Sequence, residues 1–211
     1  MAQAKTLTQA ELDQVLRYVA TKQHAARNRL LVLMSFWSGM RVGEIAALRI
    51  CDVRNEDGTI KGEVRLAATQ TKGRFGRVVL LNERLREEIA QYLRNTNRPA
   101  HLPLFPTAKK SGFTPNTLAQ WFYWTYKRAG IAGASSHSGR RTFITTLASK
   151  GVGVNGLAGV GMNGYAENGS KTHGYSSARN SPRIDLNEGQ LAGVCQCQYV
   201  YTHTVVGELQ F

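Results

Sequence analysis

The chain has 211 residues, of which 42% are hydrophobic and 19% charged, enough for one full core or two small ones. Lysine and arginine (27) exceed aspartate and glutamate (14), and the net charge of +13 favours a polyanionic partner such as nucleic acid. No stretch approaches the roughly 20 apolar residues of a membrane span, and the N-terminus lacks the apolar region of a secretory signal. We therefore expect an intracellular, cytoplasmic protein with no membrane partner.

The first predicted helix begins at Thr8, because Glu11, three residues later, completes a capping box. Apolar residues then recur at helical spacing as far as Val19. A second helix is expected over residues 25–38, and Gly39 is placed to end it.

A third helix is predicted from about Val42. Next, the apolar residues of 64–66 and 78–81 flank a basic segment with glycines, which predicts a β-hairpin. A helix over residues 83–95 follows, with apolar residues on one face.

Two further helices complete the pattern. Thr114 followed by Pro115 predicts the start of an aromatic helix, whose spacing from Trp121 to Tyr126 favours core packing over stacking on bases. The last clear helix covers residues 137–150.

The predicted fold is mainly α with a small antiparallel β-sheet, in the α+β class. We expect residues 1–152 to form one core. Residues 153–211 are rich in glycine, and we expect them to form an irregular C-terminal segment. The chain has three cysteines, an odd number that argues against a disulfide framework, and no set of ligands at zinc spacing, so no metal is expected.

Four basic residues stand where loops meet predicted elements. Arg41 follows a glycine turn and opens the third helix, and Lys72 lies at the tip of the hairpin. His137 and Arg140 form a His-x-x-Arg pattern at the start of the last helix, a spacing that places them on one face. A helix N-terminus also favours a phosphate. The order and setting of the four residues form a compound pattern, which is more informative than any one of them alone.

With these motifs, residues 6–152 resemble the catalytic domain of the tyrosine recombinases, also called phage-type integrases. The resemblance is specific because motifs that are separated in this sequence occur in the family's order and at the same kinds of predicted elements. The matching stretches are Leu7-Thr-Gln-Ala-Glu-Leu, Ser38-Gly-Met-Arg-Val-Gly-Glu-Ile-Ala-Ala-Leu, Thr71-Lys-Gly-Arg and His137-Ser-Gly-Arg-Arg-Thr-Phe-Ile-Thr.

The resemblance implies site-specific recombination of double-stranded DNA through a 3′-phosphotyrosyl intermediate. By resemblance, Arg41 and Arg140 clamp the scissile phosphate. Lys72 protonates the leaving 5′ oxygen, and His137 assists proton transfer or orients the phosphate. The family's mechanism implies no cofactor, metal or small-molecule substrate, and self-association on DNA as a synaptic tetramer.

The nucleophilic tyrosine is not fixed by the resemblance. The family pattern has a Gly-His pair and then a tyrosine about nine residues later, which the glycine-rich segment does not reproduce. His173 lies in a scrambled version of that pair. Tyr201 has the best local context for the nucleophile, and Tyr175 has the better distance from Arg140. An alignment through Ile184 puts Arg183 at this position, and arginine cannot form the ester.

Several alternatives stay open. Translation of residues 155–183 from a shifted reading frame would explain the loss of patterning. The chain begins with the catalytic domain and has no N-terminal core-binding domain, which indicates a minimal recombinase or a fragment. A catalytically inactive, DNA-binding remnant of an integrase is the main functional alternative. A basic structural or RNA-binding domain is the third.

Overall fold

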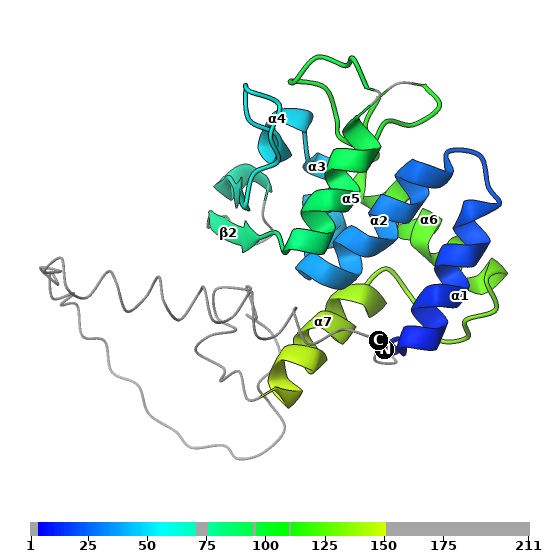
Figure 1. The fold of residues 1–211 in the computed structure, drawn as a ribbon. Coiled ribbons are helices and arrows are strands. Elements are labelled where there is room, and N and C mark those ends of the chain that lie inside the picture. The colour runs from blue at the N-terminus through cyan, green and yellow to red at the C-terminus, as the bar shows by residue number, and fades with distance from the viewer. Residues whose placement is uncertain (1–3, 71–75, 95, 110, 151–211) are drawn as a thin grey trace, which may run out of the picture. The chain divides into compact units, whose positions relative to one another are not determined.

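The computed structural model describes residues 4–70, 76–94, 96–109 and 111–150. The described part is mainly helical with one two-stranded antiparallel sheet, which confirms the predicted class (Figure 1). Its elements are α1 (Gln9–Ala20), α2 (Ala25–Ser38), α3 (Val42–Ala47), α4 (Ile50–Val53), β1 (Glu63–Leu66), the 3-10 helix η1 (Ala68–Gln70), β2 (Arg77–Leu80), α5 (Glu83–Leu93), α6 (Pro115–Arg128) and α7 (Ser138–Ser149).

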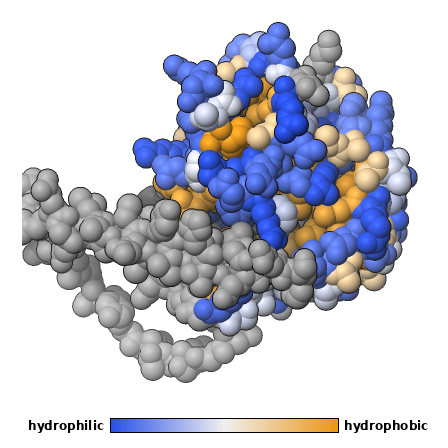
Figure 2. Space-filling model, viewed as in Figure 1, coloured by the Kyte–Doolittle hydropathy of each residue, from blue (hydrophilic) through white to orange (hydrophobic). Residues whose placement is uncertain are grey.

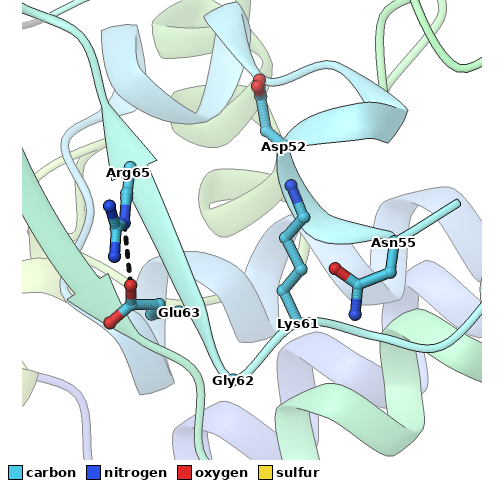
Figure 3. A pocket seen from close by; sticks show the side chains of 6 residues that line it. All are labelled: Asp52, Asn55, Lys61, Gly62, Glu63 and Arg65. Atoms are coloured by element: carbon cyan, nitrogen blue, oxygen red, sulfur yellow. Dashed lines mark hydrogen bonds and ion pairs between the residues drawn. The ribbon is translucent and has the colours of Figure 1, made fainter.

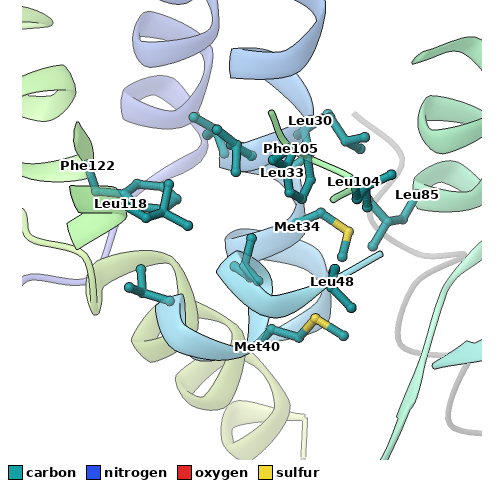
Figure 4. Close-up of a cluster of buried hydrophobic side chains, with 14 of the residues drawn as sticks. Leu30, Leu33, Met34, Met40, Leu48, Leu85, Leu104, Phe105, Leu118 and Phe122 are labelled. Carbon is teal, nitrogen blue, oxygen red and sulfur yellow. The ribbon is translucent and has the colours of Figure 1, made fainter. Parts of the chain in front are cut away.

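Helix α2 is the centre of the core. Five consecutive residues, from Leu30 to Met34, are all buried, which requires neighbours around the whole circumference of the helix. These neighbours include α1, α3, α5 and α7. Figure 4 shows Leu33 and Met34 of α2 among side chains of other segments, including Leu85 of α5 and Phe105. The middle of α2 is therefore held by packing on several sides.

Local capping explains where two helices begin. Thr8 Oγ1 accepts a hydrogen bond from the Glu11 amide (3.2 Å), and Glu11 Oε2 accepts one from the Thr8 amide (2.9 Å), as the capping box predicts. Helix α6 begins with Thr114 as its N-cap and Pro115 in its first turn. Both starts agree with the sequence prediction.

The predicted hairpin strands form β1 and β2. Their register pairs Glu63 with Leu80 and Leu66 with Arg77. The turn that the sequence predicts between them falls on residues 71–75, outside the described residues. Two short elements, α4 and η1, were not predicted, because segments of three or four residues carry too little periodicity to be recognised.

The aromatic run on α6 divides between core and surface. Phe122 and Tyr126 are buried, which confirms core packing for them. Tyr123 and Trp124 are each 47% exposed, so the core-packing prediction was wrong for this pair. The reason is geometric, because consecutive residues turn by about 100° around a helix and a run of aromatic residues cannot all face one side.

The described surface is largely polar. Figure 2 shows a mostly hydrophilic face with separate apolar patches. Among the described helices, none has the length and hydrophobicity to cross a membrane.

Candidate active site

The site is built where α7 packs against the end of α2. Gly39 follows α2 with a positive φ of 60°, a conformation that glycine adopts without strain. A Cβ at Gly39 would collide with the Phe143 ring, and a Cβ at Gly139 would lie 3.0 Å from the Ser35 Cβ. The two glycines therefore allow α7 to approach α2 closely, and this approach brings distant parts of the sequence together.

Arg140 lies in the first turn of α7 and is only 9% exposed. Its Nη1 donates a hydrogen bond to the carbonyl oxygen of Gly39, 101 residues earlier in the chain. Arg41 follows two residues after Gly39 as the N-cap of α3, with its side chain 28% exposed. Two of the predicted site residues therefore meet at one place.

Burial and like charge perturb Arg140. Burial lowers the pKa of Arg140, and the nearby positive charges of Arg41 and Arg77 lower it further, to about 10. Arg140 therefore keeps its charge at neutral pH, in surroundings that favour the arrival of an anion.

Glu44 neutralises part of this charge. It is 1% exposed and accepts two hydrogen bonds from Arg41, one from the backbone amide to Oε2 (2.7 Å) and one from Nη1 to Oε1 (3.1 Å). Arg77 of β2 donates through Nε to Oε1 (3.2 Å) and through Nη2 to Oε2 (2.5 Å). Burial alone would raise the pKa of Glu44, but the hydrogen bonds from Arg77 and Arg41 outweigh it and hold the pKa below its usual value.

We refer to Arg41, Arg77, Arg140 and Glu44 as the arginine cluster. Arg41 and Arg77 share the Glu44 carboxylate and Arg140 lies within reach of their charges, so the four residues together carry a net charge of two positive units. Guanidinium groups bind phosphate oxygens through paired, parallel hydrogen bonds. The cluster therefore has the charge and the donor chemistry of a site for a phosphate group.

The other predicted site residues fall in two groups. His137 is exposed at the N-cap of α7, one turn before Arg140, and its backbone amide donates to Ser135 Oγ (3.3 Å). The remaining candidates, Lys72, His173, Tyr175 and Tyr201, lie outside the described residues. The same holds for residues 155–183, for which a shifted reading frame was considered.

The sequence analysis did not single out Glu44 and Arg77. Glu44 had a readable signal, because it stands three residues after Arg41 at the start of a helix, where a carboxylate caps the backbone. Arg77 carried no comparable signal in the sequence. Its contact with Glu44 depends on how β2 packs beside α3.

A polar pocket of about 380 Å³ lies elsewhere, between α4 and β1 (Figure 3). It has no residue in common with the arginine cluster, and it mixes acidic and basic side chains. Within the described residues, no group of three histidine, cysteine, aspartate or glutamate side chains is arranged to hold a metal ion. The pocket is lined by Asp52, Asn55, Lys61, Gly62, Glu63 and Arg65.

The model of the phage integrase family matches residues 5–172, which is most of the chain. This chain belongs to the phage integrase family. The match includes all four members of the arginine cluster, together with His137 and Lys72.

Curated relatives of this integrase-family chain include two archaeal recombinases. It is 28% identical over 154 residues to the tyrosine recombinase XerA of Pyrococcus furiosus, covering 71% of this chain and 50% of the relative. It is 26% identical over 155 residues to XerA of Thermococcus kodakarensis, covering 72% of this chain and 52% of the relative. The chain thus spans about half the length of the curated relatives it matches.

Solved structures show the same fold. A crystal structure of XerA recombinase matches with a TM-score of 0.59 at 20% identity, over 74% of this chain and 54% of that one. The Tn1549 transposon integrase, in complex with circular intermediate DNA, matches with a TM-score of 0.58 at 17% identity, over 78% of this chain and 59% of that one. The described residues therefore have the fold that these recombinases share.

Proposed function

We propose that this chain cleaves and rejoins DNA strands in site-specific recombination, with the scissile phosphate bound between Arg41 and Arg140. The observation that carries the proposal is that Arg140 bonds to the carbonyl of Gly39, two residues before Arg41. Membership of the phage integrase family and the matches to two XerA recombinases support the same reaction. The net charge of +13 supports double-stranded DNA as the partner.

In the proposed reaction, a tyrosine oxygen attacks the phosphorus atom, and the bond from phosphorus to the 5′ oxygen breaks. Arg41 and Arg140 bind the non-bridging oxygens, where negative charge accumulates in the transition state. Lys72 gives a proton to the leaving 5′ oxygen, and His137 assists proton transfer or orients the phosphate. Tyr201 and Tyr175 are the candidate nucleophiles. His173, two residues before Tyr175, is a further candidate catalytic residue.

The 3′-phosphotyrosyl bond preserves the energy of the cleaved phosphodiester, so rejoining needs no nucleotide. A 5′ hydroxyl of a second strand attacks this bond and releases the tyrosine. Exchange between two duplexes needs several active sites at once, and we extend the proposal to a synaptic tetramer acting on DNA in the cytoplasm. The Tn1549 integrase, which was solved with circular intermediate DNA, supports the DNA partner.

A suicide-substrate assay tests this function. The protein is incubated with nicked duplexes that carry candidate sites, and covalent protein–DNA adducts are detected on a denaturing gel. We expect an adduct that is lost in Arg140→Ala and in one tyrosine-to-phenylalanine variant. Arg17→Ala, which removes an exposed charge on α1, is the matched control and should keep the adduct.

The opposite outcome identifies the main alternative. Salt-sensitive binding of duplex DNA without an adduct, over a library of sites, would mark an inactive DNA-binding remnant. A third result, with DNA affinity reduced equally by Arg140→Ala and Arg17→Ala, would show that the cluster has no special role and would contradict the proposal.

A further inference from the structure

We propose that Arg77 is a positioning residue, which fixes the Glu44 carboxylate and through it the phosphate-binding guanidinium of Arg41. The inference rests on the proposed function for the role of Arg41. The contacts among the residues do not depend on that function.

The geometry places Glu44 between two arginines. Each of its oxygens accepts one hydrogen bond from Arg41 and one from Arg77, so the carboxylate is held from both sides. The paired contact from Arg77 is the fork arrangement that fixes both the distance and the orientation of a carboxylate. If Arg77 were absent, Glu44 would keep its contacts to Arg41, and the carboxylate would be held from one side instead of two.

Burial makes this constraint effective. The side chains of Arg77 and Glu44 are 10% and 1% exposed, so water has little access to replace a lost hydrogen bond. Removing one partner of a buried ion pair leaves an uncompensated charge, which forces the surrounding groups to rearrange. The group that shares the carboxylate with Arg77 is Arg41, so this is where the rearrangement should appear.

The same sheet contains a natural comparison. On the neighbouring strand β1, Arg65 pairs with Glu63 at 2.9 Å, but its side chain is 83% exposed. Exposed ion pairs contribute little to structure because water and salt screen them. Arg65→Ala is therefore a matched control, since it removes an arginine–glutamate pair from the same sheet without touching the arginine cluster.

Arg77 differs from a direct phosphate ligand in one measurable way. Two of its side-chain nitrogens, Nε and Nη2, donate to Glu44 and its side chain is 10% exposed, whereas Arg41 gives Glu44 one side-chain nitrogen and is 28% exposed. A residue that binds a DNA phosphate contributes about one unit to the salt dependence of DNA affinity. A residue that acts only through Glu44 and Arg41 makes no contribution of its own, so its removal changes the salt dependence no further once Arg41 has been removed.

The first experiment measures the order of the Arg41 side chain in the free protein. Nitrogen-15 relaxation of the Arg41 Nε–H group is compared in the wild type, Arg77→Ala, Arg77→Lys and Arg65→Ala, with thermal unfolding to confirm that each variant is folded. We expect lower order in Arg77→Ala, an intermediate value in Arg77→Lys and wild-type order in Arg65→Ala. Wild-type order in folded Arg77→Lys and Arg77→Ala would overturn the proposal, whether or not the protein is active.

The second experiment measures the rate of adduct formation and the salt dependence of DNA binding. Misplacement of a binding group by 1 Å reduces rates by about 100-fold, and we expect a fall of that order in Arg77→Ala. Adding Glu44→Gln should cause no further fall, because both changes remove the same constraint. A salt dependence lower by one unit in the double variant Arg41→Ala/Arg77→Ala than in Arg41→Ala would show that Arg77 itself binds a phosphate and would reject the positioning role. Absence of any adduct with the wild type would contradict the proposed function, while the order of Arg41 would still decide this inference.

Discussion

Gly139 of α7 lies directly against Ser35 of α2, so that an added Cβ would be 3.0 Å from the Ser35 Cβ and carbonyl carbon. This contact sets how closely the helix that carries Arg140 approaches the helix that ends before Arg41. The position of both arginines thus depends on a residue without a side chain, in the middle of the His-x-x-Arg pattern.

Replacing Gly139 with alanine should therefore destabilise the protein. Overpacking of a buried contact costs about 1–3 kcal/mol, and we expect a loss of that size in the free energy of unfolding. Chemical denaturation measures it. Ser35→Gly should restore part of the loss in the double variant, because it removes the side-chain atoms that the new methyl group meets. Equal stability of Gly139→Ala and the wild type would show that the helices are not in this contact.

An anion should stabilise the arginine cluster through Arg140. The melting temperature of each protein is measured in chloride and in sulfate at equal ionic strength. We expect the rise from chloride to sulfate to be larger for the wild type than for Arg140→Met. The pKa of Arg140 is lowered from its usual value to about 10 in the fold, so the charge that binds the anion disappears as the pH rises through 10. The difference between the two proteins should vanish above that pH.

Without an anion, Arg140→Met should melt at the same or a higher temperature than the wild type. Burial and the charges of Arg41 and Arg77 lower the pKa of Arg140, which means that its charged form opposes folding, and an apolar side chain of similar size removes that opposition. A large loss of stability in chloride would mean that the bond to Gly39 outweighs the repulsion from Arg41 and Arg77.

Acid should weaken the wild type more steeply than Glu44→Gln. The pKa of Glu44 is lowered from 4.5 in the fold, so its contribution to stability is complete above pH 4.5 and is lost as the pH falls through the folded-state pKa. Glutamine does not titrate, and the variant lacks this part of the pH dependence. Urea denaturation at a series of acidic pH values measures both slopes, and parallel slopes would contradict the depressed pKa.

The aromatic helix offers a test of burial. Phe122→Ala should cost about 3–5 kcal/mol of unfolding free energy, because the ring is fully buried in the core. Trp124→Ala should cost clearly less than Phe122→Ala, because nearly half of that side chain is already exposed. A large effect from Trp124 would show that its ring is packed more tightly than its exposure indicates.

Local signals in the sequence predicted much of the fold. The capping residues Thr8 and Thr114 and the helix-ending Gly39 act on their own neighbours, so they can be recognised without knowing the rest of the structure. Arg41 and Arg140 could be chosen for the same reason, since each opens a helix after a glycine-containing motif. That they meet each other was an expectation from family resemblance rather than from local pattern.

What the sequence did not reveal depends on contacts between distant segments. Arg77 reads as an ordinary charged residue at a strand end, and only the packing of β2 beside α3 brings it to Glu44. Tyr123 and Trp124 read as part of an apolar run, but the face of α6 that meets the core was not marked in the sequence. These features depend on tertiary structure, which cannot be read from the composition and periodicity of a single segment.

The surplus of positive charge in the arginine cluster also links the stability of the fold to its affinity for anions. Holding Arg41, Arg77 and Arg140 close together with a single carboxylate opposes folding, and burial of Arg140 adds to that opposition. The same groups that oppose folding in the empty site favour binding when an anion fills it. The cluster therefore exchanges stability for affinity.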